Sequence, residues 1–358
     1  MEAARIERLR TEMKKNELSA YLISNSYNRR YISGFTGSAG WVLITLDRAI
    51  LLTDFRYMTQ APQQAVHFEV VEHGAQPLDN VRQLLSEMQI KELAFEQDHV
   101  SYAQYVQVEQ ALEGIRLTPS DSLIEQVRLV KDSSEIKVMR EAAQLADQAF
   151  THILKHIKPG VTEKAIALEL EVFMRSHGAV SSSFEIIVAS GERSALPHGI
   201  ASDRLLQPNE FVKLDFGAYY QGYCSDITRT VVLGKPEAKH IEIYECVKKA
   251  QQTCLDGLKP GITGAQGDAL ARKVIEEAGY GAYFGHGTGH GLGMEVHEAP
   301  RLSKTCETVL QPGMCVTVEP GIYLPDFGGV RIEDDVVITE NGIDILTQST
   351  KELITIDI

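Results

Sequence analysis

The sequence predicts an α/β protein of the α+β type that folds into two domains. Short apolar runs alternate with amphipathic stretches up to about residue 120, a cluster of turn-forming residues follows, and two motifs of the second half each occur twice. A chain of 358 residues is long enough for two domains with well-buried cores. We place the boundary near residue 124 and expect domains over 1–124 and 125–358.

The first domain is expected to contain a sheet covered by helices. The runs that predict its strands are AYLIS (20–24), WVLITL (41–46), AILLT (49–53), FEVVE (68–72) and ELAFE (92–96). The stretches MEAARIERLRTEMKK (1–15) and PLDNVRQLLSEMQ (77–89) instead carry apolar residues at helical spacing. Strands that alternate with helices are typical of an α/β domain.

The second domain is expected to begin with a long amphipathic helix. Turn-forming residues cluster at Thr118–Asp121, and the amphipathic segment DSSEIKVMREAAQLADQAFTHILKHI follows them. Ser133 or Ser134 would cap this helix, because a serine hydroxyl can accept a hydrogen bond from a backbone N–H of the first turn.

An internal repeat organises the rest of the second domain. KPGVT at 158–162 recurs as KPGIT at 259–263, and QPNEFVKLDFG at 207–217 recurs as QPGMCVTVEPG at 311–321. The two offsets are nearly equal, since 259 − 158 = 101 and 311 − 207 = 104, which argues against a chance match of common turn motifs. We expect two halves, each with a helix and a hairpin, that pack face to face.

Composition argues against several classes of partner, and we expect a cytoplasmic protein. A formal net charge of −14 argues against nucleic acid and anionic membrane surfaces. The start of the chain lacks the apolar run of a signal peptide, and no segment has the 18 apolar residues of a membrane span. The five cysteines are odd in number and form no CxxC pair, which predicts free thiols in a reducing compartment.

The stretch GHGTGHGLGMEVHE (285–298) holds three histidines on a glycine-rich backbone. Its five glycines in nine residues would destabilise a helix by several kcal/mol, so we reject a zinc-binding helix that carries His286 and His290. In an extended chain these histidines share one face with Thr288, and the bare opposite face should pack against another segment. A glycine-rich phosphate loop is the alternative, although the stretch lacks a P-loop lysine.

A first pair of carboxylates is expected in the hairpin predicted over 211–233. If this hairpin turns at Tyr220 and Gln221, residues opposite each other have numbers that sum to about 441. Asp215 and Asp226 meet this condition, because 215 + 226 = 441, and their Cβ atoms would lie roughly 5 Å apart.

A second pair of carboxylates is expected in the hairpin predicted over 315–339. This hairpin would fold about Asp326, so that Glu319 faces Glu333, because 319 + 333 = 2 × 326. Asp334 would point to the opposite face and Asp335 would lie one pair further along the strands, so neither is included in the site.

Two facing pairs of like charges require a counter-charge, which two divalent cations would supply. Four carboxylates together with His290 form a mostly oxygen ligand set that suits Mn²⁺, Co²⁺ or Zn²⁺. For any single acid, a solvated strand face is the alternative interpretation.

The residues of this set resemble the dinuclear metallopeptidases with the pita-bread fold, a family that includes methionyl aminopeptidase, aminopeptidase P and prolidase. The segments LDFG, SDITRT, GHGTGHGLG, VEPGIY and GVRIEDD fill the five ligand positions with Asp215, Asp226, His290, Glu319 and Glu333. The segments YISGFTGSAGWVLIT and TDFRY resemble the creatinase-type domain that accompanies aminopeptidase P and prolidase. The resemblance covers the whole chain and implies a creatinase-like domain followed by a pseudo-twofold pita-bread catalytic domain.

The resemblance implies an Xaa-Pro peptidase with two divalent metal ions, with Mn²⁺ expected first and Co²⁺ or Zn²⁺ as alternatives. It implies that Asp226 and Glu333 bridge both metals, that Asp215 binds one, and that His290 and Glu319 bind the other. A hydroxide between the metals would attack the peptide bond, and Glu319 would pass its proton to the leaving nitrogen. Small peptides with proline in second position are the expected substrates, and the expected assembly is a homodimer.

Three histidines receive roles from the same resemblance, and Arg331 receives one from its position two residues before Glu333 on the same face. His198 in LPHG and His297 in VHE match the family histidines that hydrogen-bond the scissile carbonyl and the tetrahedral oxyanion. His286 would line the pocket that receives proline, with a buried histidine of purely structural role as the alternative. Arg331 would orient the carboxylates as a neighbour of Glu333, with an ordinary surface arginine as the alternative.

One arginine bears on substrate length. Arg301 follows His297 by four residues, at the position where some prolidases carry an arginine that binds the free carboxylate of a dipeptide. A solvated surface arginine is the alternative. Arg301 favours an Xaa-Pro dipeptidase over an Xaa-Pro aminopeptidase that acts on longer peptides, and a non-catalytic binding module on the same fold is the third possibility.

Overall fold

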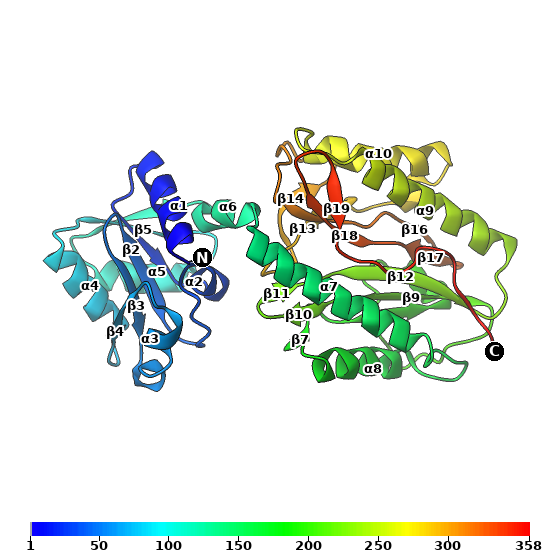
Figure 1. The fold of residues 1–358 in the computed structure, drawn as a ribbon, viewed down its shortest axis with the longest axis horizontal. Coiled ribbons are helices and arrows are strands. Elements are labelled where there is room, and N and C mark those ends of the chain that lie inside the picture. Colours follow the sequence, from blue (N-terminus) through cyan, green and yellow to red (C-terminus); the bar gives the residue numbers. More distant parts are fainter. Residues whose placement is uncertain (1) are drawn as a thin grey trace. The chain divides into compact units, whose positions relative to one another are not determined.

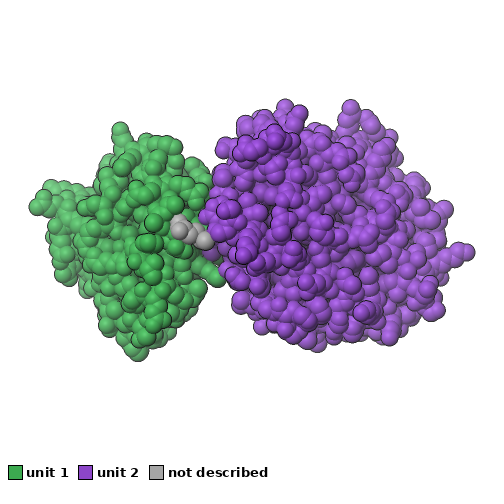
Figure 2. All heavy atoms as spheres, viewed as in Figure 1, with its two compact units in different colours: residues 1–128 green, residues 129–358 purple. Residues whose placement is uncertain are grey.

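The structure of the protein is a computed structural model that describes residues 2–358. The chain divides into two compact units, residues 1–128 and 129–358 (Figure 2). The boundary expected near residue 124 falls within helix α6 (Leu123–Leu129), shortly before the observed division. The expected start of the first helix at Met1 lies outside the described residues.

Unit 1 is built on a six-stranded mixed sheet with the strand order β4-β3-β2-β1-β5-β6 (Figure 1). Its strands are β1 (Ala20–Ile23), β2 (Trp41–Thr45), β3 (Ala49–Thr53), β4 (Glu69–Glu72), β5 (Glu92–Glu96) and β6 (Arg116–Ser120). The first five strands confirm the five apolar runs. Strand β6 was not predicted, because it is an edge strand whose sequence RLTPS contains no apolar run.

Helices cover the sheet of unit 1. They are α1 (Glu2–Lys15), α2 (Ser26–Ser33), η1 (Phe55–Tyr57), α3 (Ala61–Gln64), α4 (Pro77–Glu87), α5 (Tyr102–Ala111) and α6. Helix α1 buries Ile6, Leu9 and Met13, which recur at the three- and four-residue spacing of one helical face.

Unit 2 places its central strands between two pairs of helices, with α7 and α8 on one side and α9 and α10 on the other (Figure 1). The helices are α7 (Ser133–Ile153), α8 (Glu163–Ser176), η2 (Gly191–Ala195), α9 (Ala238–Gly257), α10 (Gly264–Glu277) and η3 (Gly281–Tyr283). Asp132, and not Ser133 or Ser134, caps α7, because its carboxylate accepts the N–H groups of Ser134 and Glu135 at 2.9 and 3.0 Å. An aspartate satisfies these orphan donors as well as a serine does.

The strands of unit 2 form two larger sheets, β20-β12-β9-β8 and β14-β13-β15-β18-β19, and two small ones, β11-β10-β7 and β16-β17. Their bounds in the first half are β7 (Ser181–Ser182), β8 (Ile187–Ser190), β9 (Glu210–Phe216), β10 (Ala218–Tyr220), β11 (Tyr223–Cys224) and β12 (Ile227–Leu233). In the second half they are β13 (Gly289–Gly291), β14 (Glu298–Leu302), β15 (Cys315–Val318), β16 (Gly321–Leu324), β17 (Gly328–Arg331), β18 (Asp334–Ile338), β19 (Ile343–Ile345) and β20 (Thr355–Ile356).

The internal repeat is confirmed by equivalent helix caps and turns. Thr162 caps α8 and Thr263 caps α10, and each accepts a backbone N–H of its first helical turn. The glycines of the two KPG motifs both adopt positive φ, and so do Asn209 and Gly313 at the third position of QPN and QPG. Residues of these types tolerate the left-handed region, which explains why the turn motifs recur.

The expected register of the first carboxylate hairpin is wrong by two residues. Asp215 lies opposite Thr228, so partners sum to 443, and the turn falls on Gln221 and Gly222, with φ of 49° and 96°. A tight hairpin turn requires positive φ at both central residues, which glycine supplies more readily than tyrosine. Because the error is an even number of residues, Asp226 stays on the expected face of the hairpin.

The expected register of the second carboxylate hairpin is confirmed. Val318 pairs with Asp334 on one side of the acidic residues, and Gly321 pairs with Arg331 on the other, so partners sum to 652 throughout. Glu319 and Glu333 lie between these two ladders.

No helix within residues 2–358 combines the length and the apolar character that crossing a membrane requires. All five cysteines are free thiols, as the sequence predicts, and Cys224, Cys254 and Cys315 are buried.

Candidate metal centre

A cavity of about 590 Å³ lies in unit 2, and all ten residues that the sequence singles out line it. These residues are His198, Asp215, Asp226, His286, His290, His297, Arg301, Glu319, Arg331 and Glu333. They come from both halves of the repeat, so the fold brings together side chains that are far apart in the sequence.

The four acidic side chains are carried at the ends of strands. Asp215 lies on β9, Asp226 directly precedes β12, Glu319 directly follows β15, and Glu333 directly precedes β18. Asp215, Asp226 and Glu333 are at most 6% exposed, and Glu319 is partly buried. The backbone N–H of Glu333 donates to the carbonyl oxygen of Thr228 at 3.1 Å, which joins the two halves at the acidic cluster.

His290 presents one ring nitrogen to the acids. Its Nδ1 lies 3.0 Å from the carbonyl oxygen of Gly291, which makes Nδ1 the protonated nitrogen. The unprotonated Nε2 lies 3.7 Å from Asp226 Oδ2 and 3.4 Å from Glu319 Oε1. Ligand atoms of Asp226, His290 and Glu333 lie within 4.8 Å of one another, close enough to share one cation.

The close packing expected against the bare face of the glycine-rich stretch is confirmed from Gly287 to Gly293, whereas none of the described residues packs against Gly285. A Cβ atom on Gly289 would lie 1.9 Å from the carbonyl oxygen of Thr317, and one on Gly291 would lie 2.1 Å from that of Ala299. No side chain fits at such distances, so glycine lets β13 approach the backbones of its neighbours closely. This close approach fixes His290, the residue between the two glycines, against the acidic cluster.

The negative charge of the acidic cluster is only partly compensated within residues 2–358. Without a bound cation, burial raises the pKa of Asp226 and of Glu333 well above the usual range, and repulsion from the neighbouring carboxylates adds to this shift. Burial also raises the pKa of Glu319, to about 7, and lowers that of His290 to about 3. Asp226 Oδ1 is buried and has no hydrogen-bond partner within residues 2–358. A neutral imidazole and an unpaired carboxylate oxygen are the ligands that a divalent cation requires.

Arg331 is the buried cation that contacts the acids. Its Nη2 is paired with Asp215 Oδ2, and its Nε lies 3.8 Å from Glu319 Oε2. Its Nη1 donates to the hydroxyl of Tyr323 at 2.8 Å. One guanidinium cannot neutralise four carboxylates, so the cavity keeps a negative charge that favours further cations.

Two other residues support the acids from outside the ten. Thr228 Oγ1 donates to Glu333 Oε2 at 2.5 Å, and Asp335 Oδ2 accepts the N–H of Asp226 at 2.9 Å. Asp335 therefore lies closer to the cluster than the sequence suggested. Asp334 points away, as predicted, and pairs with Arg229 at 2.7 Å.

His286 lines the cavity with both ring nitrogens occupied. Its Nδ1 lies 2.8 Å from the carbonyl oxygen of Gly287, and its Nε2 lies 2.7 Å from the hydroxyl of Tyr323. The Tyr323 hydroxyl accepts from Arg331 and so has its proton free to donate to His286. Burial lowers the pKa of His286 to about 4. Tyr323 was not predicted, although it stands in the VEPGIY motif that carries Glu319.

The pKa of His286 predicts a pH dependence of stability. Since an unfolded histidine has a pKa of about 6.5, the unfolded chain takes up this proton first as the pH falls. The contribution of neutral His286 to stability is therefore present above pH 6.5 and lost as the pH falls to 4. We expect metal-free wild type to lose about 2 kcal/mol more unfolding free energy than His286→Gln between pH 7 and pH 5, measured by urea unfolding. Equal losses in the two proteins would contradict this.

Comparisons with known proteins identify the family. Residues 137–340 match the model of metallopeptidase family M24, and residues 5–130 match the creatinase/prolidase N-terminal domain. An Xaa-Pro dipeptidase of Pyrococcus horikoshii is 41% identical over 344 residues, which cover 96% of each chain.

Solved structures share the whole fold. A structure described as an Xaa-Pro dipeptidase from Bacillus anthracis is 52% identical, with a TM-score of 0.97 over 99% of this chain and 100% of that one. An X-Pro aminopeptidase from Thermotoga maritima is 40% identical, with a TM-score of 0.91 over 96% of this chain and 99% of that one. These likenesses confirm the expected creatinase-like and pita-bread domains. The chain belongs to metallopeptidase family M24.

Proposed function

We propose that the protein is an Xaa-Pro dipeptidase that binds two divalent cations, Mn²⁺ before Co²⁺ or Zn²⁺. The observation that carries this proposal is the convergence of four carboxylates and one imidazole nitrogen, with Asp226 Oδ1 buried and without a hydrogen-bond partner among the described residues. The cavity of about 590 Å³ is of the size that holds small ligands. A ligand set made mostly of oxygen atoms favours Mn²⁺.

The ligand roles follow from the family resemblance and fit the geometry. Asp226 and Glu333 would hold both cations, Asp215 one of them, and His290 with Glu319 the other. The 3.4 Å between His290 Nε2 and Glu319 Oε1 is a suitable separation for two ligands of one ion. Arg331 would then hold the carboxylate of Asp215 in place through the second oxygen, Oδ2.

Hydrolysis requires a nucleophilic water and a proton for the leaving nitrogen. Two cations bound here would lower the pKa of a water molecule towards neutrality and polarise the scissile carbonyl. Glu319 is the least buried of the four acidic residues, so it can take up the proton of the attacking water. It would then deliver this proton to the proline nitrogen, which carries no proton in the peptide bond.

Three histidines would contact the substrate. The rings of His198 and His297 make no hydrogen bond with any residue of 2–358, which leaves them available to the carbonyl oxygen and the oxyanion. His286 has no ring nitrogen to spare and would instead present its ring to proline.

Arg301 favours a substrate that ends at proline. Its guanidinium lines the cavity, is exposed, and has no ion-pair or hydrogen-bond partner within residues 2–358. Its charge nevertheless acts on the site, because it is the second cause, behind burial, that lowers the pKa of His297. A planar guanidinium with free donors suits the carboxylate of a dipeptide. Relatives are named either as Xaa-Pro dipeptidases or as X-Pro aminopeptidases. The proposal of a dipeptidase therefore depends on Arg301.

Arg301→Ala is expected to raise KM for Xaa-Pro dipeptides at least tenfold, a loss of about 1.4 kcal/mol or more. Hydrolysis of Xaa-Pro-Xaa tripeptides should change little, because they offer a neutral amide at this position. Dipeptide amides, which match the dipeptides in size but lack the charge, should be poor substrates of wild type and unaffected by the substitution.

Arg301→Lys is the control for charge without a planar fork, and it should lie between wild type and Arg301→Ala. Equal effects of Arg301→Ala on dipeptides and tripeptides would count against a dipeptidase. So would faster cleavage of tripeptides than of dipeptides by wild type, and either result would favour an Xaa-Pro aminopeptidase.

A further inference from the structure

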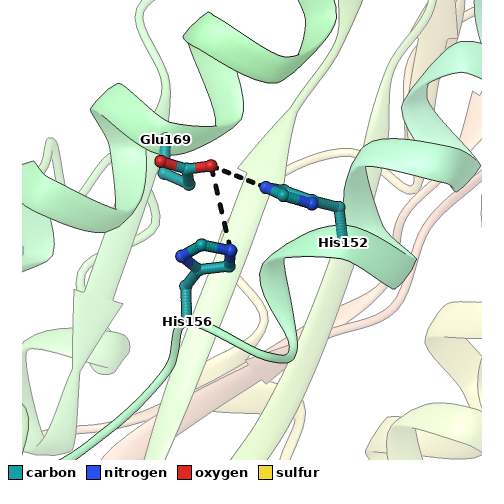
Figure 3. Close-up of side chains that lie close together, drawn as sticks. All are labelled: His152, His156 and Glu169. Carbon is teal, nitrogen blue, oxygen red and sulfur yellow. Dashed lines mark hydrogen bonds and ion pairs between the residues drawn. The ribbon is translucent and has the colours of Figure 1, made fainter.

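We propose a second metal site in unit 2, formed by His152, His156 and Glu169, which binds a late first-row divalent cation such as Zn²⁺ (Figure 3). None of the three residues lines the cavity described above. The proposal therefore does not depend on the proposed peptidase function.

Two helices bring the three side chains together. His152 lies in the last turn of α7, and the chain continues in helical conformation through Leu154, with φ −54° and ψ −27°. His156 consequently follows His152 by about one turn on the same side, the spacing at which two histidines can chelate one ion. Glu169 projects from α8, and Figure 3 shows one of its carboxylate oxygens facing a nitrogen of each ring.

The distances suit a metal ion after small side-chain movements. Glu169 Oε1 lies 2.6 Å from His152 Nε2 and 3.8 Å from His156 Nε2, and all three ligand atoms lie within 4.8 Å of one another. Tetrahedral Zn²⁺, with bonds of about 2.0–2.1 Å, separates its ligands by about 3.3 Å. The two observed distances bracket this value. The side chains of His152, Glu169 and His156 are 27%, 34% and 41% exposed, so they can adjust and leave a fourth position to water.

A cation explains the cluster better than an ion pair does. A single proton between His152 and Glu169 would satisfy only one of the two imidazoles that face Oε1. Protonating both rings would place two positive charges side by side, since the ring centroids are 4.5 Å apart. A divalent cation is attracted by the carboxylate and accepts a lone pair from each neutral ring.

Neighbouring rings hold the cluster in place. The ring of Phe173 stacks on His152 at a centroid distance of 4.4 Å and on His177 at 4.0 Å. His177 Nδ1 lies 2.8 Å from the carbonyl oxygen of Phe173, so this ring is directed to the backbone and not to the cluster. His177 is therefore a matched control, because it is a nearby histidine on the same ring stack that does not belong to the site.

The ligand types predict a metal preference that differs from that of the cavity. Two imidazoles and one carboxylate favour Zn²⁺ or Cu²⁺ over Mn²⁺, because nitrogen ligands and the Irving–Williams order both act in that direction. The four-carboxylate cavity accepts Mn²⁺ more readily. Bound Zn²⁺ would tie the end of α7 to α8.

The test counts metal ions per chain in the full-length protein. Wild type, His156→Ala, Glu169→Gln and His177→Ala are stripped with chelator, loaded with Zn²⁺, dialysed and measured by inductively coupled plasma mass spectrometry. We expect His156→Ala and Glu169→Gln each to hold one Zn²⁺ per chain fewer than wild type, and His177→Ala to hold the same number as wild type. After loading with Mn²⁺, all four proteins should hold equal amounts.

The side chain of His156 is 41% exposed, so its replacement should preserve the fold, which circular dichroism would verify. Equal Zn²⁺ contents in wild type and His156→Ala would overturn the proposal, and so would an equal loss in His177→Ala. If the only Zn²⁺ held by wild type disappears in His156→Ala, and wild type holds no Mn²⁺ after loading with Mn²⁺, the second site is supported and the dinuclear cavity is contradicted, so the two proposals can fail separately.

Discussion

Asp226→Asn is expected to abolish peptidase activity and to remove bound metal from the cavity while the protein stays folded. Asp226 Oδ1 is a buried oxygen without a hydrogen-bond partner within residues 2–358, and the carboxylate would hold both cations. An amide keeps the size of the side chain but removes the charge that attracts the two ions. Glu333→Gln should have the same effect, because Glu333 would be the corresponding bridging acid of the second half.

The folding of these variants can be predicted from the same electrostatics. In the metal-free protein, burial and repulsion from neighbouring carboxylates make the charged forms of Asp226 and Glu333 unfavourable. Replacing one of them relieves this repulsion, so the metal-free variant should unfold at the same urea concentration as metal-free wild type or at a higher one. Asp203→Asn is a suitable control, because the side chain of Asp203 is 84% exposed and lies outside the cavity.

The measurements are the rate of Xaa-Pro dipeptide cleavage, metal content by mass spectrometry and the urea midpoint. Asp203→Asn should match wild type in all three. A Glu333→Gln protein that is active and retains two cavity metals would show that the ligand assignment is wrong.

Most of the fold could be predicted from local sequence patterns. Apolar runs determine strands such as β1, β2, β3 and β5 because a buried strand needs consecutive apolar residues. The edge strand β6 was missed because its sequence RLTPS contains no apolar run, whereas the other edge strand, β4, has two adjacent valines. The N-cap of α7 could not be predicted to the residue, because Asp132, Ser133 and Ser134 can all cap a helix and the tertiary structure determines which one does. The division between the units within α6 likewise depends on tertiary contacts that local sequence patterns do not specify.

The residues of the candidate site could be predicted from the sequence, but the hydrogen bonds that support them could not. The repeat and the hairpins bring the acids together whether or not the register is correct to two residues. The contacts of Thr228, Asp335 and Tyr323 with the site join segments about 37 to 109 residues apart. Such contacts follow from packing, because no local periodicity specifies which hydroxyl or carboxylate meets a buried partner.

His297→Ala is expected to lower kcat by about 10²-fold or more while the metal content stays near that of wild type. The ring of His297 lines the cavity, meets the ring of His290 edge-on at 4.5 Å, and has no hydrogen-bond partner within residues 2–358. Burial and the charge of Arg301 lower its pKa, so it is a neutral donor at pH 7. A donor of this kind strengthens its hydrogen bond as negative charge develops on the carbonyl oxygen.

His290→Ala should behave differently, because the Nε2 of His290 faces Asp226 and Glu319 and would be a metal ligand. We expect this variant to lose metal affinity, and high metal concentrations should restore part of its activity. The same addition should not help His297→Ala, since its metals are already bound. His297→Gln keeps a donor and should recover part of kcat without any change in metal content. If His290→Ala and His297→Ala lose metal and activity in parallel, the two histidines share one role and His297 is not the oxyanion donor.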